Sequence, residues 1–175
     1  MSEYEIDVRE LSLEEDGPYP NSHLPLLVYR RVFPRKGEIT KDLQDLFSRN
    51  GWEDQWVNGL YPFHHFHSTA HEVLGIATGQ VAIQFGGPNG QVVTVSKGDV
   101  ALIPAGVSHK QVGKTPDLLV IGAYPTGQNA DLQYGRMETK GQAEENIAGV
   151  PLPDSDPVFG REGPLFHSWG VSLMH

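Results

Sequence analysis

The segment 60–124 limits the possible folds more than any other part of the sequence, because it consists of short β-prone runs separated by glycine, proline or asparagine. Within one run, Val81, Ile83 and Phe85 alternate with smaller or polar residues, which is typical of a strand with one buried face. Strands are predicted at residues 61–67, 73–78, 80–86, 91–96, 99–103, 107–112 and 118–124. Short strands at even spacing favour an all-β sandwich or barrel.

The segment before this region predicts two strands and one short helix. Residues 4–8 and 26–32 have the β-branched and aromatic content of strands. Residues 40–50 form the one well-patterned helix, with Thr40 as its N-cap and apolar residues on one face. Two tryptophans, Trp52 and Trp56, follow the helix and are expected to be buried where it meets the next sheet.

The chain of 175 residues has a length that suits one domain. Residues 1–58 would supply N-terminal strands and the helix, and residues 59–124 the β core. Residues 125–175 are rich in proline, with a weak helix pattern at 138–147. This tail carries large apolar anchors, so we expect it to wrap the barrel. The anchors are Phe159, Leu165, Phe166 and Trp169.

Charge and composition exclude several classes of function. The 13 Lys and Arg against 22 Asp and Glu give a net charge of −9, which disfavours binding to nucleic acid or to anionic lipid. Without cysteine there is no disulfide, thiolate ligand or cysteine nucleophile. The acidic N-terminus does not look like a signal peptide, and no apolar run is long enough to span a membrane. A soluble, cytoplasmic protein is expected.

Histidines concentrate in one short stretch and predict a metal site. Alternation along a strand places His65 and His67 on the same face, about 7 Å apart. Glu72 begins the next strand, and His109 follows a Pro-Ala-Gly turn. Three imidazole nitrogens and one carboxylate oxygen suit one divalent ion of Fe, Mn, Ni or Zn per chain. Because structural zinc usually has four protein ligands, often cysteine, this set is more typical of a site that also binds a ligand.

The neighbouring histidines are expected to have other roles. His64 and His71 each adjoin a predicted ligand, so alternation turns their side chains to the opposite face. We expect them to pack or to hydrogen-bond near the site rather than to bind the metal directly.

The same residues carry a resemblance to a known family. Gly59-x5-His65-x-His67-x4-Glu72-x6-Gly79 resembles the first cupin motif, and Gly98-x5-Pro104-x-Gly106-x2-His109 resembles most of the second. The second motif normally ends in asparagine, where this chain has Gly113. The stretches LPLLVYR, HHFHSTAHEVLG, GAYPTGQ and DPVFG further resemble the small bacterial YjlB-like single-domain cupins. The resemblance implies a jelly-roll β-barrel with His65, His67, Glu72 and His109 as metal ligands inside it.

Two functions remain open at this point. The first is a metal-dependent enzyme acting on a small organic molecule, as a dioxygenase with iron or as an isomerase or lyase with another metal. The second is a non-catalytic module that binds a metal or a small ligand. The expected pocket is mostly apolar, and strand parity assigns to it Tyr61, Phe63, Leu74, Ile76, Val81, Ile83 and Phe85.

Access and assembly are also predicted. Tyr61, Phe63, Ile83 and Phe85 are the candidate substrate-binding residues, and Tyr61 is also a candidate acid–base group. Phe166 and Trp169 are expected to cover the barrel mouth. A homodimer is expected, with an edge strand at 26–32 as its interface.

Overall fold

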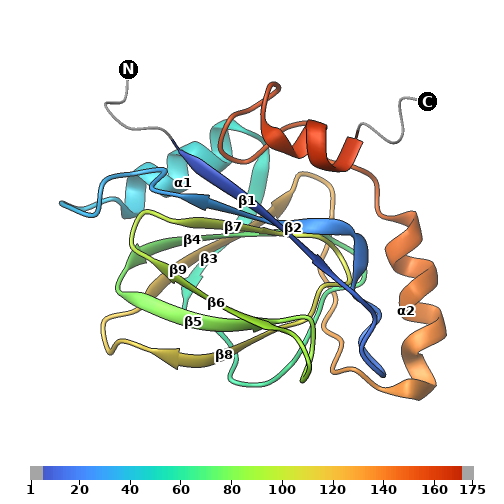
Figure 1. Ribbon diagram of the computed structural model, residues 1–175. Helices are drawn as coiled ribbons and strands as arrows, with labels where there is room; N and C mark the ends of the chain where they lie inside the picture. The colour runs from blue at the N-terminus through green and yellow to red at the C-terminus, as the bar shows by residue number, and fades with distance from the viewer. Residues whose placement is uncertain (1–5, 171–175) are drawn as a thin grey trace.

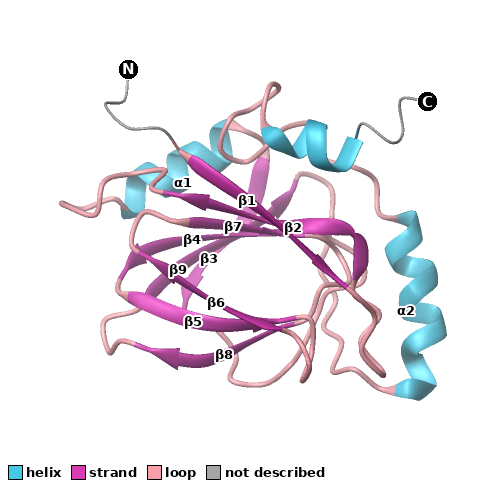
Figure 2. Ribbon diagram, viewed as in Figure 1, coloured by secondary structure: helices cyan, strands magenta, loops and turns pink. Residues whose placement is uncertain are grey.

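The computed structural model describes residues 6–170, which form two antiparallel sheets with helices on the outside (Figures 1 and 2). The strands are β1 (Asp7–Leu13), β2 (Ser22–Arg30), β3 (Trp52–Asn58), β4 (Glu72–Thr78), β5 (Gln80–Phe85), β6 (Gln91–Ser96), β7 (Val100–Ile103), β8 (His109–Lys114) and β9 (Leu119–Pro125). The helices are α1 (Thr40–Arg49), α2 (Met137–Gly149) and a π-helical turn, η1 (Phe166–Gly170).

The strand order is β1-β2-β7-β4-β9-β3 in the larger sheet and β6-β5-β8 in the smaller one. The strands from β4 to β9 follow the sequence prediction closely, because glycine and proline mark almost every turn between them. Among the described residues the two sheets do not join into a closed barrel. The predicted edge strand at 26–32 falls in β2, which lies between β1 and β7 and is therefore not an edge.

Two cores lie on opposite faces of the larger sheet. The inner core fills the space between the sheets, with Leu74 and Ile76 of β4 facing Ile83 and Phe85 of β5. The outer core lies between the larger sheet and the helices, where Phe47 of α1 packs on the sheet. Alternate residues along β4 enter alternate cores, as strand geometry requires.

Helix α1 begins at the predicted residue but without the predicted cap. Thr40 makes no capping hydrogen bond with its side chain, and Ile39 occupies the cap position. Instead the Glu38 carboxylate accepts a hydrogen bond from the Thr40 backbone N–H at 2.8 Å, so an acidic side chain satisfies this end of the helix. Within the described residues, no helix has the length and apolar character needed to cross a membrane.

The tail is held against the outer core by a buried carboxylate. Asp156 is fully buried and accepts hydrogen bonds from the Tyr29 hydroxyl at 2.7 Å and from the Leu165 backbone N–H at 3.1 Å. It also accepts from the backbone of Val158 and Phe159. Burial, followed by the nearby Asp156 charge, raises the pKa of Tyr29, so its hydroxyl keeps the proton that it donates.

Replacement of Tyr29 by phenylalanine should lower the free energy of unfolding by about 2 kcal/mol, because a buried carboxylate loses a donor. Urea denaturation would measure this change. The matched control is Tyr134→Phe, whose side chain is 49% exposed and which should change stability by less than about 0.5 kcal/mol. Equal stability of the two variants would show that the Tyr29–Asp156 contact does not anchor the tail.

Candidate metal centre

The predicted histidines meet where an irregular segment lies beside β8. Residues 61–67 do not form the predicted strand, since only single bridges pair them: His65 with His109 and Phe66 with Gln133. The His65 and His109 backbones exchange two hydrogen bonds, of 3.2 and 2.9 Å. Pro62 cannot donate a ladder hydrogen bond, and this is consistent with the broken pairing.

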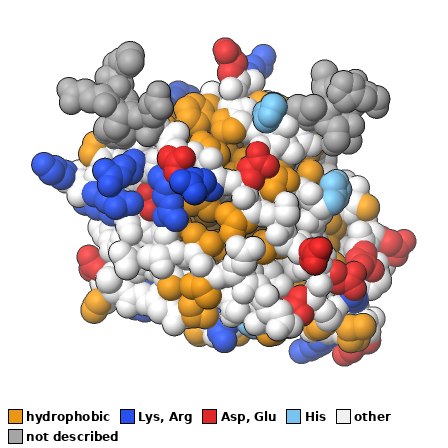
Figure 3. Space-filling model, viewed as in Figure 1, with side chains coloured by type: hydrophobic (Ala, Val, Ile, Leu, Met, Phe, Trp, Pro, Cys, Tyr) orange, Lys and Arg blue, Asp and Glu red, His pale blue; other side chains and the backbone are white. Residues whose placement is uncertain are grey.

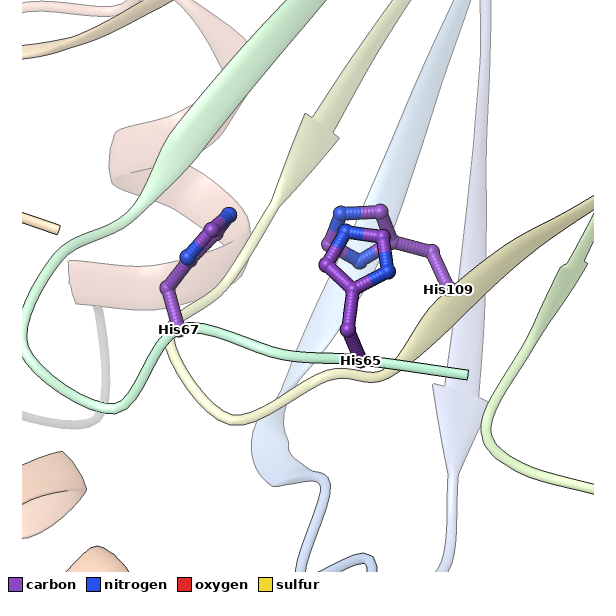
Figure 4. A group of neighbouring side chains, drawn as sticks. All are labelled: His65, His67 and His109. Carbon is purple, nitrogen blue, oxygen red and sulfur yellow. The ribbon is translucent and has the colours of Figure 1, made fainter. Parts of the chain in front are cut away.

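The side chains of His65, His67 and His109 point toward one another (Figure 4). One nitrogen from each ring lies within 4.8 Å of the others. The ring centroids of His65 and His109 are 4.2 Å apart, and that of His67 is 5.7 Å from His65. The rings of His65 and His109 are almost completely buried. The structure therefore brings the three predicted histidine ligands into one small volume.

Backbone carbonyls set the tautomer of all three rings. Each Nδ1 lies within hydrogen-bond distance of a carbonyl oxygen, which can only accept, so each Nδ1 carries the proton. The pairs are His65 with Phe63 at 3.0 Å, His67 with Asp131 at 2.5 Å and His109 with Val107 at 3.1 Å. In the neutral rings the lone pair is then on Nε2, and this is the form in which histidine binds a metal.

Glu72 completes the predicted set of four. Its Oε1 atom lies 3.3 Å from Nε2 of both His67 and His109. Burial alone would raise the pKa of Glu72, but the two histidines hold it well below its usual value. Burial likewise disfavours a charged His67 ring, yet the Glu72 carboxylate raises the pKa of His67 to about 9. Burial and the nearby His109 lower the pKa of His65 to about 3.

A cavity of about 400 Å³ opens onto these four residues. It is lined by Trp56, Val57, Asn58, Gly59, Leu60, Tyr61, His65, His67, Glu72, His109, Tyr124, Ala130, Asp131 and Leu132. Its volume is sufficient for a small organic molecule.

Of the four predicted substrate-binding residues, one lines the cavity and three do not. Tyr61 lines the cavity, and Phe63 stacks on Tyr61 outside it, with ring centroids 4.9 Å apart. Ile83 and Phe85 do not line it, because they are fully buried in the inner core. Leu74, Ile76 and Val81, also predicted to line the pocket, lie in that core as well. Parity identifies the inward face of a strand but does not separate packed core from cavity wall.

Trp56 and Tyr124 line the cavity and were not predicted to do so. Between Glu53 and Trp56, β3 has one residue more than its partner β9, and Asp54 there has a φ of 53°. This bulge reverses the side-chain alternation, so Trp52 enters the outer core and Trp56 faces the inner one. Trp56 Nε1 then donates to the Tyr124 hydroxyl at 3.1 Å.

Asp131 is a further residue that the sequence pattern did not identify. Its carbonyl accepts the hydrogen bond from His67, and its carboxylate accepts from the Ser68 backbone at 2.6 Å and from the Ser68 hydroxyl. Gln133 Nε2 donates to the same carboxylate at 2.9 Å. These contacts hold the His67 ring and the residue that follows it. More than sixty residues separate Asp131 from His67, so no local sequence motif predicts this contact.

Neither His64 nor His71 lines the cavity. The His64 ring lies 5.6 Å from that of Tyr19. His71 is buried beside Trp169, with ring centroids 4.8 Å apart. Phe166 and Trp169 were expected at the barrel mouth, but both pack against the outer core instead. The reason is that η1 follows the face of the larger sheet that points away from the cavity (Figure 1).

The cupin family model matches residues 53–134. "Uncharacterized protein YjlB" of Bacillus subtilis is 36% identical over 156 residues, which are 89% of this chain and 92% of the relative. Acireductone dioxygenase from Bacillus anthracis, solved with cadmium, is 19% identical with a TM-score of 0.37, over 53% of this chain and 64% of that chain. A variant of oxalate decarboxylase from B. subtilis is 14% identical with a TM-score of 0.37, over 68% of this chain and 30% of that one.

Binding of a divalent metal at pH 7.5 should release about one proton from His67, because this ring is protonated below its pKa of about 9 and must be neutral to bind. Calorimetry in buffers of different ionisation enthalpy measures the release. At pH 9.5 the proton has already been lost, so the release should fall and the affinity should be higher. Equal proton release at the two pH values would contradict this assignment.

Glu72→Gln is the informative variant for this measurement. Without the carboxylate, the pKa of His67 falls toward its ordinary value, so less than one proton should be released at pH 7.5. The count is per ion bound, and it is therefore independent of any loss of affinity.

Proposed function

The chain belongs to the cupin family, and from that premise we propose that it is a metal-dependent enzyme acting on a small organic molecule. The cupin resemblance found in the two sequence motifs is thereby confirmed. The observation that carries the proposal is the convergence of three Nε2 lone pairs and one carboxylate on the wall of a cavity.

The donor set fits a divalent transition metal. When neutral, all three rings have the tautomer that leaves Nε2 available, and Glu72 supplies a negative oxygen on the same side. Three nitrogens and one oxygen are the ligands that Fe, Mn, Ni and Zn accept in proteins. A bound ion would act as a Lewis acid or redox centre on an oxygen atom of the ligand. Dioxygenase, isomerase and lyase chemistry are all compatible with this set.

The cavity wall supplies a proton donor close to these ligands. The Tyr124 hydroxyl accepts from Trp56 Nε1 and lies near the Glu72 carboxylate, so its own proton is available to an acceptor in the cavity. Burial, followed by the Glu72 charge, raises the pKa of Tyr124 and keeps the hydroxyl protonated at neutral pH. Tyr124 would thus hold a proton toward an oxygen of the bound molecule, while Trp56 fixes the direction of the phenol ring.

Loss of one predicted ligand should remove most of the metal. Chain purified without added metal should contain one ion, and His65→Ala or His109→Ala should reduce this content at least tenfold, as expected when a metal ligand is lost. His64→Ala and His71→Ala are matched controls, since these neighbours point away from the cavity. Elemental analysis gives both the amount and the identity of the metal. A similar loss in all four variants would contradict the ligand assignment.

Removal of the metal should lower the melting temperature without unfolding the chain. An ion at a hundredfold excess over its dissociation constant adds about 2.7 kcal/mol to the stability of the fold that binds it. The two apolar cores do not depend on the ion and should keep the chain folded. Thermal unfolding with and without a chelator measures the difference, with chelated His109→Ala as the control that should not respond. Equal melting temperatures of the loaded and chelated protein would contradict the linkage.

Turnover distinguishes an enzyme from a binding module. Metal-loaded protein should convert some member of a panel of small hydroxy, keto and carboxylic acids, and His109→Ala should not. Oxygen consumption separates a dioxygenase from an isomerase or lyase. If members of the panel bind to the loaded protein but none is converted, the non-catalytic module becomes the better account.

A further inference from the structure

A second cavity, of about 530 Å³, lies away from the metal centre, between α2, η1 and the start of β2. It is lined by Pro20, Asn21, Ser22, His23, Leu24, His71, Ala105, Glu144, Ile147, Ala148, Gly149, Val150, Pro151, Leu152 and Trp169. His71 precedes Glu72 in an extended segment, so the two neighbouring side chains enter different cavities. The second cavity is not part of the site described above.

His71 brings an unpartnered polar atom to this cavity. The residue is only 2% exposed, and its Nδ1 accepts a hydrogen bond from the Ala105 backbone N–H at 2.9 Å. An accepting Nδ1 carries no proton, so the proton of the neutral ring is on Nε2. Within residues 6–170, this Nε2–H has no hydrogen-bond partner. A buried donor without a partner is costly, and its presence in a cavity indicates that something supplies an acceptor there.

Neighbouring contacts hold this donor in place. Gln128 accepts from the His71 backbone N–H at 3.0 Å and donates to the Pro151 carbonyl at 2.9 Å. The Pro151 carbonyl lies near the His71 ring, but not at the distance and angle of a hydrogen bond to Nε2. Trp169 packs against the ring, and its indole N–H donates to the Pro25 carbonyl at 2.8 Å. Hydrogen bonds therefore fix the groups that surround Nε2.

The rest of the lining limits the chemistry of the occupant. Ile147, Val150, Leu152 and the Trp169 ring make the wall mainly apolar, and no lysine or arginine of the described part of the chain contributes to it. Exposed Glu144 and the carbonyl end of α2 place negative potential at the rim. Acidic side chains also gather over α2 at the lower right of the space-filling view (Figure 3). An anionic ligand is thus disfavoured, and a neutral acceptor fits.

We propose that this cavity is a second ligand site, which binds a neutral, mainly apolar molecule through a carbonyl-type oxygen on His71 Nε2–H. The site is independent of the metal centre and of the function proposed for it. Its volume is within the range of small-molecule pockets.

The test compares two probes of nearly the same shape, acetophenone and ethylbenzene, of which only the first has an acceptor. Titrations of the ¹⁵N-labelled full chain should show saturable shifts of the Trp169 indole signal, with the Trp52 indole as internal control. Acetophenone should bind about fivefold more tightly than ethylbenzene, the factor expected for one net hydrogen bond. His71→Phe should remove this difference in affinity. Ala148→Trp, which adds a large side chain to the cavity wall, should prevent the binding of both probes.

A measurement on the unmodified protein keeps the test valid if His71→Phe does not fold. A long-range ¹H–¹⁵N spectrum should show the Nε2–H tautomer of His71, and acetophenone should shift it. A ring protonated on Nδ1, an Nε2 signal that does not respond, or equal affinity for the two probes would overturn the proposal.

Metal removal separates this site from the metal centre. Chelated protein and His109→Ala should bind acetophenone as the untreated chain does. Binding that disappears with the metal would locate the ketone in the first cavity and overturn the second site, while the proposed function would stand. If the untreated chain takes up no metal but still binds the ketone, the second site would be supported and the proposed function contradicted.

Discussion

The pair of backbone hydrogen bonds between His65 and His109 is the interaction on which the geometry of the candidate metal centre depends. This single residue pair holds the irregular segment 61–67 against β8. It thereby brings the first cupin motif next to the second. Gly106 makes the approach possible, because its φ of 100° turns the chain toward β8. A Cβ atom at this position would lie 2.4 Å from the Asn21 carbonyl oxygen, so the turn accepts only glycine.

Much of the β architecture was predictable from the sequence, and the exceptions have physical reasons. Strands β4 to β9 are marked by alternation and by turn residues. Strand β3 was missed because its bulge at Asp54 breaks the alternation on which strand prediction relies. Residues 61–67 have the composition of a strand but lack a continuous partner, and composition alone carries no information about partners.

The candidate site was predictable to the extent that its residues are close in sequence or belong to a motif. His65, His67 and Glu72 satisfy both conditions, and His109 belongs to the second motif; the structure brings all four together. Asp131 acts on His67 partly through a backbone carbonyl, which any residue could offer, so its identity gives no signal. Tyr124 reaches the cavity from β9, and Trp56 does so only because of the β3 bulge.

The three carbonyl contacts also explain why the centre is suited to a metal rather than to a proton network. With each Nδ1–H committed to a carbonyl, the Nε2 atoms present lone pairs to one another and to the Glu72 carboxylate, an arrangement with acceptors on every side. A proton shared by His67 and Glu72 relieves part of this mismatch, which is why the pKa of His67 is raised. It leaves the lone pair of His65 without a donor, since burial keeps that ring neutral. A cation at the centre would satisfy all four groups at once, so the backbone that orients the rings also favours a positive charge in the cavity.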